Sequence, residues 1–227
     1  MVGETMSKRV LIIAPHPDDE SLGLGGAISK FIEQGNEVHL LVVSGHLPPL
    51  YKREEYELTL SEANNAFEIL GIKNTTFLEI PATQIQDIPI HELNKKFTDV
   101  VDILKPQIVF CPYPDRHIDH RIVFESTMVA TRPVGSGKNI EILGAYETLS
   151  ETHWNAPHIE PNFTPNWVID ISNHIDNKVK ALKCYKSQIS DYPGPRSIEA
   201  AIALAQFRGT QAGFAYGEGV HIIRKIS

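Results

Sequence analysis

The chain has 227 residues, of which 42% are hydrophobic and 22% charged, a composition typical of a globular protein that can bury a full core in one domain. Its formal net charge of -7 and its lack of basic runs exclude a nucleic-acid partner, because such proteins gather Lys and Arg against phosphates. It has neither a signal-peptide core nor the roughly 20 apolar residues of a membrane span, so we expect a cytoplasmic protein. The cysteines, Cys111 and Cys184, are too few for a disulfide framework, and we expect both to be buried thiols.

The chain up to Ala130 alternates between predicted strands and predicted helices. Short apolar runs and apolar residues at helical spacing predict, in order, a strand at 10–14, a helix at 24–34, a strand at 37–43, a helix at 53–70, a strand at 75–80, a helix at 90–104, a strand at 107–111 and a helix at 120–130. Such alternation is typical of an α/β fold with a Rossmann-like, doubly wound and mostly parallel sheet.

The rest of the chain is predicted to complete the same domain. The expected elements are strands at 140–146 and 167–171, helices at 175–187 and 197–208, and a strand at 220–224. Between the first two of these strands, the Pro- and Asn-rich residues 151–166 are expected to form a loop, and loops of that length are usually functional or flexible. Because no internal repeat or low-complexity tract divides the chain, residues 1–227 are expected to form a single domain.

Two clusters of polar residues follow predicted strands. The first is Pro15-His16-Pro17-Asp18-Asp19-Glu20, directly after the first strand, and the second is Asp115-Arg116-His117-Ile118-Asp119-His120, after the fourth. Carboxylates so close together repel each other unless a cation neutralises them. Alone, the first cluster would also suit a turn with a helix cap. Because ligands of doubly wound sheets bind outside the carboxyl ends of the strands, we expect both clusters in one site.

The two clusters together suit a catalytic zinc site. His16, Asp19 and His120 form a set of three ligands that leaves a fourth position open for water. Zinc lowers the pKa of bound water to about 7 and polarises a carbonyl oxygen, so an amide or ester could be attacked at neutral pH.

Three further residues of the clusters then acquire expected roles. Asp18 is the expected general base for the attacking water. His117 is expected to stabilise the oxyanion or to protonate the leaving nitrogen, and Asp119 to hold the His117 imidazole. Glu20 is expected to lie just outside the set of ligands, and no role is assigned to it.

The glycines that follow the first cluster raise the alternative of a dinucleotide site. Gly23-Leu24-Gly25-Gly26 opens a helix after a strand, as the dinucleotide fingerprint does. The strand-to-helix turn itself, however, holds three carboxylates that would repel a pyrophosphate, and the second strand ends without an acidic residue for a ribose hydroxyl. We therefore exclude a dinucleotide cofactor and expect the glycines to let the helix pack closely on the sheet.

Taken together, Pro15 to Glu20 and His117-Ile-Asp-His120 resemble the motifs of the LmbE-like, or PIG-L, zinc deacetylases, which remove the acetyl group from N-acetylglucosaminyl compounds. The resemblance implies an LmbE-like fold, one Zn²⁺ per chain, and the same ligands, base and electrophilic histidine as above. It also implies that Arg53 contacts the substrate sugar or its aglycone. Weaker marks of the family include Arg196-Ser197. The family usually has a sugar-binding Asp after the third strand, whereas this chain has Ile80-Pro-Ala-Thr-Gln84 there. We therefore expect the sugar hydroxyls to be recognised differently.

The predicted function is a zinc-dependent N-deacetylase whose partner is a small-molecule N-acetyl amino sugar or its conjugate. Family members are often oligomeric, so a homo-oligomer is possible. One rival is another metal-dependent hydrolase, such as a phosphoesterase, which often uses two metal ions. Another rival is a non-catalytic metal-binding or sugar-binding protein. The spare Asp18 and His117 argue against it, because binding alone needs neither.

Overall fold

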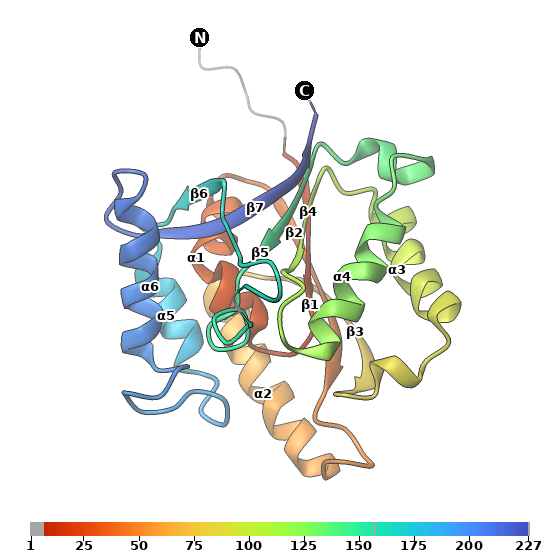
Figure 1. Ribbon diagram of the computed structural model, residues 1–227, viewed down its shortest axis with the longest axis horizontal. Coiled ribbons are helices and arrows are strands. Elements are labelled where there is room, and N and C mark those ends of the chain that lie inside the picture. The colour runs from red at the N-terminus through yellow and green to blue at the C-terminus, as the bar shows by residue number, and fades with distance from the viewer. Residues whose placement is uncertain (1–6, 157, 227) are drawn as a thin grey trace.

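The computed structural model describes residues 7–156 and 158–226. A seven-stranded sheet forms its middle layer, with helices on both sides (Figure 1). The strands are β1 (Arg9–Ala14), β2 (Glu37–Gly45), β3 (Asn74–Pro81), β4 (Ile108–Pro112), β5 (Ile142–Tyr146), β6 (Trp167–Asp170) and β7 (Gly217–Lys225). Their order in the sheet is β3-β2-β1-β4-β5-β7-β6, with parallel pairing from β3 to β5 and antiparallel pairing of β7 with both of its neighbours. The α/β class and the mostly parallel sheet are thus confirmed.

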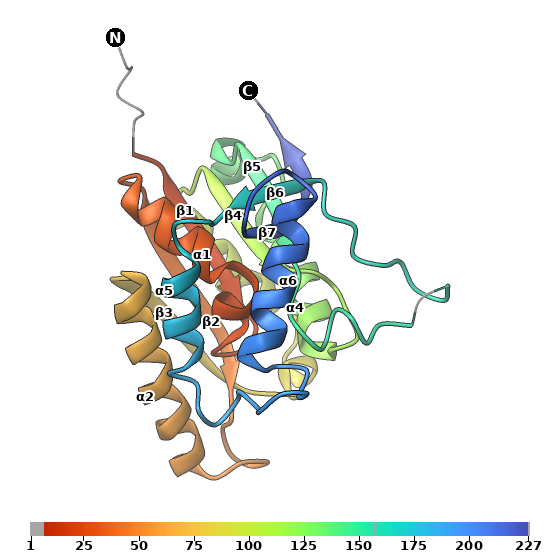
Figure 2. The ribbon, with the colours of Figure 1, turned by 90° about the vertical axis from the view of Figure 1, so that its left-hand side faces the viewer.

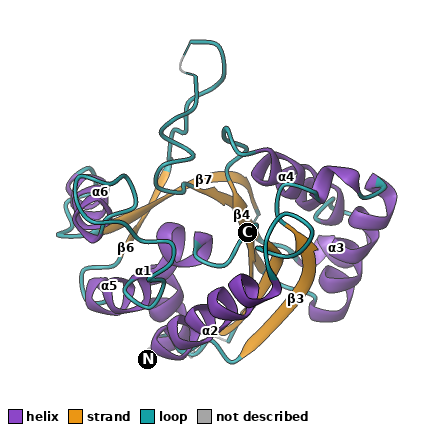
Figure 3. Cartoon of the chain, turned by 90° about the horizontal axis from the view of Figure 1, so that it is seen from below, coloured by secondary structure: helices purple, strands orange, loops and turns teal. Residues whose placement is uncertain are grey.

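Six α-helices and two short 3₁₀ helices cover this sheet in the described part of the chain. They are α1 (Asp19–Glu33), α2 (Arg53–Leu70), η1 (Ile85–Asp87), α3 (Ile90–Leu104), α4 (Ile118–Ala130), η2 (Gly135–Asn139), α5 (Ile175–Leu182) and α6 (Ile198–Thr210). Seen from below, α1, α2, α5 and α6 lie on one side of the sheet and α3 and α4 on the other (Figure 3).

The central strand β1 is apolar throughout because it contributes to a core on each face. Val10 and Ile12 pack into the cluster that includes residues of α1, α2 and α5, whereas Leu11 and Ile13 pack into the cluster of α3 and α4. All four side chains are at most 1% exposed. A strand buried on both faces cannot alternate between apolar and polar residues, which is why this run is continuous. Its carboxyl end is therefore fixed firmly where the first polar cluster begins.

Several predicted boundaries are wrong, most importantly that of α1. It begins at Asp19 rather than at residue 24, because the acidic cluster itself forms the first helical turn, where carboxylates favour the amino end of a helix. Similarly, α4 begins at Ile118 rather than at residue 120. Helix α5 ends at Leu182 rather than at residue 187, and Ser187 instead donates to the Glu62 carboxylate of α2 through its backbone N–H and its hydroxyl. The last strand, β7, is longer than predicted.

The predicted loop between β5 and β6 contains no helix or strand over residues 151–156 and 158–166, and it extends away from the body of the molecule (Figure 2). Cys111 is a buried thiol as predicted, but Cys184 is partly exposed, at the point where α5 gives way to a turn. Within the described residues, the helices are too short or too polar to cross a membrane.

A buried ion pair links the end of β5 to α6. Arg208 donates through Nε and Nη2 to the two carboxylate oxygens of Glu147, at 2.7 and 2.6 Å, and Nε2 of His153 lies 3.2 Å from the same carboxylate. Burial alone would raise the pKa of Glu147, but the hydrogen bonds from Arg208 and His153 outweigh burial and hold this pKa below its usual value. The ionised form of Glu147 is therefore the one that stabilises the fold.

Replacing Glu147 with Gln is expected to lower the free energy of unfolding at neutral pH by about 3 kcal/mol, since it leaves the Arg208 charge buried without its partner. A carboxyl whose pKa is lowered on folding stabilises the protein above its unfolded pKa, and this contribution disappears as the pH falls through the folded value. Urea unfolding should therefore show a full difference between wild type and variant at neutral pH that shrinks below about pH 4. A difference that does not shrink in acid would contradict this assignment.

Candidate active site

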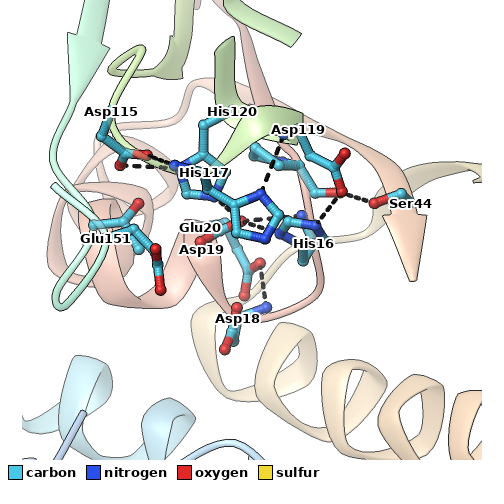
Figure 4. A network of polar contacts seen from close by, with 12 residues as sticks. His16, Asp18, Asp19, Glu20, Ser44, Asp115, His117, Asp119, His120 and Glu151 are labelled. Atoms are coloured by element: carbon cyan, nitrogen blue, oxygen red, sulfur yellow. Dashed lines mark hydrogen bonds and ion pairs between the residues drawn. The ribbon is translucent and has the colours of Figure 1, made fainter. Parts of the chain in front are cut away.

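A pocket of about 130 Å³ lies at the carboxyl ends of β1, β2 and β4. It is smaller than the roughly 300 Å³ at the lower end of drug-sized sites. Its lining consists of His16, Pro17, Asp18, Gly45, His46, Tyr51, Thr59, Ala82, Thr83, His117, Glu151, Gln188 and Arg196. The rings of His16 and His117 are 4.7 Å apart between centroids, so the two clusters do meet in space (Figure 4).

Three side chains converge beside this pocket in a way that suits a metal ion. Nδ1 of His16 lies 3.2 Å and Nε2 of His120 lies 3.3 Å from Oδ2 of Asp19, and these three residues form one of the groups able to hold an ion. Nε2 of His120 and Oδ1 of Asp19 are buried and have no hydrogen-bond partner among the described residues. Leaving such atoms unpaired is costly, and a cation bound between them would satisfy both. The ligand set and the unpaired atoms therefore fit Zn²⁺.

In each of His16 and His120, the ring nitrogen that faces away from the Asp19 carboxylate contacts another carboxylate. Oδ2 of Asp119 lies 2.9 Å from Nε2 of His16 and also accepts the Thr83 N–H, while Oδ2 of Asp115 lies 3.0 Å from Nδ1 of His120. Such contacts fix the orientation of a ligating imidazole and raise its basicity. The predicted role of Asp119 needs correction here, because its carboxylate contacts His16 and not the His117 imidazole. Asp115, which the sequence offered only as part of the cluster, has the matching role for His120.

The same carboxylates make the histidines basic in the metal-free chain. Burial would lower the pKa of His16, but hydrogen bonds to Asp119 and Asp19 raise it to about 9. Burial likewise opposes the charge on His120, yet attraction to Asp19 and the hydrogen bond to Asp115 raise its pKa to about 10. Both nitrogens of each imidazole are therefore protonated at neutral pH in the metal-free chain, and a metal ion bound there would have to displace one of these protons.

Asp18 is a buried carboxylate at the wall of the pocket, only 2% exposed. Its φ of 122° is a conformation that a non-glycine residue keeps only where the surrounding structure enforces it, and such strain is concentrated at functional sites. Its backbone N–H donates to the carboxylate of Glu20, which also accepts the Tyr185 hydroxyl. Burial raises the pKa of Asp18 to about 7, although Arg196 opposes this effect. A carboxylate with such a pKa suits a general base at neutral pH.

Arg196 is a pocket residue that the sequence indicated only through the weak Arg196-Ser197 mark. Its Nη1 lies 2.9 Å from Oδ2 of Asp18, its Nε donates to the Ser150 hydroxyl, and its Nη2 lies 3.8 Å from Glu151. It therefore fixes Asp18 in one orientation. The contact joins residues 178 positions apart in the chain, which no local pattern could predict.

His117 lines the pocket and is the N-cap residue of α4. Burial and the positive charges of His16 and His120 lower its pKa to about 4, so the imidazole is neutral at neutral pH. Its Nδ1 accepts the backbone N–H of Asp119 at 3.2 Å, which leaves the proton on Nε2. Neutral His117 is thus a hydrogen-bond donor through Nε2.

The structure does not bring Arg53 into the pocket. Arg53 is in the first turn of α2, where its side chain is 55% exposed, lies 3.6 Å from the Glu57 carboxylate and stacks over the Tyr56 ring. His46 and Tyr51, from the loop before α2, line the pocket instead, with their rings 4.4 Å apart.

Comparison with known proteins identifies the family to which this chain belongs. The family model for GlcNAc-PI de-N-acetylase, PIG-L, matches residues 11–131. The diacetylchitobiose deacetylase of Thermococcus kodakarensis is 28% identical over 232 residues, which cover 96% of this chain and 84% of that protein. The solved N,N'-diacetylchitobiose deacetylase of Pyrococcus horikoshii, in complex with an inhibitor, has a TM-score of 0.77 and 25% identity, covering 96% of this chain and 84% of that one.

A second solved structure shares the fold alone. The 4-carboxy-2-hydroxymuconate hydratase of Pseudomonas putida has a TM-score of 0.77 but only 20% identity, over 97% of this chain and 98% of that one. One fold thus carries more than one chemistry, and the activity has to be argued from the site. The family model, by contrast, spans more than half of the chain and both His/Asp clusters, so the chain belongs to the PIG-L, or LmbE-like, family.

Proposed function

We propose that the protein is a zinc-dependent N-deacetylase that hydrolyses the acetamide of an N-acetylglucosamine-type amino sugar or its conjugate and releases acetate. One observation carries the proposal. The unpaired, buried ligand atoms of Asp19 and His120 lie beside Asp18, a carboxylate with a pKa of about 7 in a pocket wall. The activity of the diacetylchitobiose deacetylases, relatives that match almost the whole chain, supports the choice of an acetamide.

Zinc, held by His16, Asp19 and His120, would polarise the acetamide carbonyl and acidify the attacking water. Asp18 accepts a proton from that water as its oxygen adds to the carbonyl carbon. Nε2–H of His117 donates a hydrogen bond to the developing oxyanion.

The reaction ends when the carbonyl carbon–nitrogen bond breaks. The proton held by Asp18 passes to the leaving nitrogen, which gives an amine and acetate. Arg196 keeps Asp18 directed at the reacting atoms throughout, because it is paired with Asp18 at 2.9 Å.

The charges of the pocket favour a sugar without a phosphate on the bound ring. Arg196 is the one Lys or Arg side chain among the described residues lining the pocket, and Asp18 and Glu151 already accompany its charge. A phosphate on the bound ring would therefore lose its hydration without gaining a free Lys or Arg side chain. Arg53 lies outside the lining, so its proposed contact is with a part of the substrate that projects from the pocket.

We expect zinc-loaded protein to release acetate from diacetylchitobiose with a kcat/KM at least about 10-fold above that for N-acetylglucosamine 6-phosphate, which corresponds to about 1.4 kcal/mol. The measurement is enzymatic detection of acetate across a panel of free, conjugated and phosphorylated N-acetylglucosamines. A preference for the phosphorylated sugar would overturn the charge argument alone. Silence across the panel with zinc bound would overturn the deacetylase proposal.

Metal stoichiometry separates the proposal from a two-metal phosphoesterase. A second group able to hold an ion, His16 with His117 and Asp119, shares His16 with the first. Filling both groups would require one imidazole to bridge two ions through both nitrogens, and a neutral imidazole has only one free lone pair. We therefore propose one ion per chain.

The carboxylate behind His120 provides a graded test of the metal site. Replacing Asp115 with Asn is expected to weaken zinc affinity about 10-fold to 100-fold, because the imidazole loses the partner that orients it and raises its basicity. Competition with a chromogenic chelator measures the affinity. An Asp99→Asn variant, which makes the same change on the exposed face of α3, serves as the control. Unchanged affinity in Asp115→Asn would contradict the proposed ligand role of His120.

The extent of the domain is also a proposal. We infer that the chain forms one doubly wound domain, which is supported over residues 7–156 and 158–226 by the seven-stranded sheet and by the apolar clusters on its two faces. Residues 1–6, 157 and 227 lie outside the described residues.

A further inference from the structure

Helix α1 is broken within its first two turns. Leu24 has φ −134° and ψ 16°, which are not helical values, so the helix consists of a short first segment that starts at Asp19 and a second segment that ends at Glu33. A break of this kind leaves carbonyls at the end of the first segment and N–H groups at the start of the second without helical partners. Since residues around the break are buried, these groups must find partners elsewhere.

A buried ion pair supplies those partners. Nζ of Lys178, from α5, lies 2.6 Å from Oε1 of Glu218, from β7, and the two side chains are only 4% and 3% exposed. Lys178 also donates to the carbonyl of Leu22, at 2.7 Å, on the first segment. The Glu218 carboxylate accepts the N–H groups of Gly26 and Ala27, at 3.0 and 2.7 Å, on the second segment. The positively charged Lys178 thus lies at the C-terminal end of the first segment, and the negatively charged Glu218 lies at the N-terminal end of the second. Both placements are favoured by the helix dipoles.

The glycines after the first cluster make room for this arrangement. A Cβ on Gly25 would come within 3.1 Å of Cγ of Lys178, and one on Gly26 within 2.7 Å of Ile171. Close approach of α5 and the strand-to-helix loop to the break therefore requires residues without side chains. These contacts explain why Gly25 and Gly26 of the glycine motif lack side chains.

The first segment connects the break to the candidate metal site. It contains Asp19, whose Oδ2 lies between His16 and His120, and Glu20, whose carboxylate accepts the backbone N–H of Asp18. Leu22, which Lys178 holds, is less than one helical turn from Asp19. Lys178 and Glu218 themselves lie outside the lining of the pocket. The first segment thus joins the break to Asp19, whose carboxylate also accepts the His16 backbone N–H.

We propose that Lys178 and Glu218 are positioning residues: by bridging the break in α1 they fix the segment that presents Asp19 to the metal and anchors Asp18. The inference rests on the proposed function for the identity of the metal. It adds a pair of residues that contact neither metal nor substrate but determine how tightly the metal is held.

The test compares two variants with a matched control. Lys178→Met leaves Glu218 as an unpaired buried charge, so this variant loses stability as well as geometry. The double variant Lys178→Met with Glu218→Gln removes both charges and should recover much of that stability. Glu147→Gln is the control, because it disrupts a nearby buried ion pair whose charged groups, in the described part of the chain, make no hydrogen bond to α1.

The double variant is expected to bind zinc at least about 10-fold more weakly than wild type at a temperature where both are fully folded, the loss seen when other indirect supports of a ligand are removed. Its kcat should fall while its KM changes little. Its backbone amides at residues 19–24 should exchange with deuterium faster than in wild type. Glu147→Gln should bind zinc like wild type despite its lower stability.

Two results would overturn the inference: zinc affinity in the double variant within twofold of wild type, or unchanged amide exchange at residues 19–24. Failure of the proposed function is distinguishable. If wild type bound zinc but released no acetate, the measurements of zinc affinity and amide exchange would still decide the role of Lys178 and Glu218. If wild type bound no zinc, the zinc proposal would fail and the exchange arm would decide whether the pair fixes the segment.

Discussion

Replacing Asp18 with Asn is expected to lower the kcat for acetate release by about 10²-fold to 10⁴-fold, the range that general base catalysis contributes. Asn keeps the size of the side chain and its contact with Arg196 but cannot accept a proton from water. Zinc should remain bound, because Asp18 does not belong to the His16, Asp19 and His120 group. Acetate assays and metal analysis on the same sample measure both quantities.

The Asp99→Asn variant is again the control for Asp18→Asn, since it makes the same chemical change on an exposed helix face, where Asp99 pairs with Lys95. It should retain the wild-type kcat. Full turnover by Asp18→Asn with zinc bound would show that another group takes the proton.

Replacing Asp19 with Asn is expected to weaken zinc affinity by more than about 100-fold, which exceeds the loss seen for residues that only hydrogen-bond to a ligand. Acetate release should be lost as well. The substitution takes away the negative charge that lies close to both His16 and His120 and keeps the shape of the side chain. Chelator competition and acetate assays measure the two losses.

The ligand series tests the geometry more strictly than any single variant. Zinc affinity should fall in the order wild type, Asp115→Asn, Asp19→Asn. If Asp115→Asn bound zinc more weakly than Asp19→Asn, the assignment of ligand and supporting residue would be reversed.

The sequence predicted the parts of the site that depend on neighbours in the chain. Polar residues directly after β1 and β4 lie at one edge of a parallel sheet by topology, so the meeting of His16 with His117 and His120 could be predicted. The sheet followed from apolar runs such as residues 10–14, which must be buried on both faces.

The parts that sequence reasoning missed depend on contacts between distant segments. Arg196 reaches Asp18 from the turn before α6, and Lys178 reaches Leu22 from α5. The orientation of Asp119 toward His16 depends on the register between α4 and the loop after β1, which residue spacing does not determine. The start of α1 was missed for a different reason: apolar periodicity begins only at Leu24, whereas the turn before it is polar and buried.

The most direct test of the central claim is acetate release from diacetylchitobiose as zinc is removed and returned. After dialysis against a chelator, with residual zinc measured in the same sample, acetate release should disappear. It should then recover in proportion to added zinc and reach its maximum at one ion per chain. Acetate release that persists in protein shown to be free of metal would contradict the proposed function.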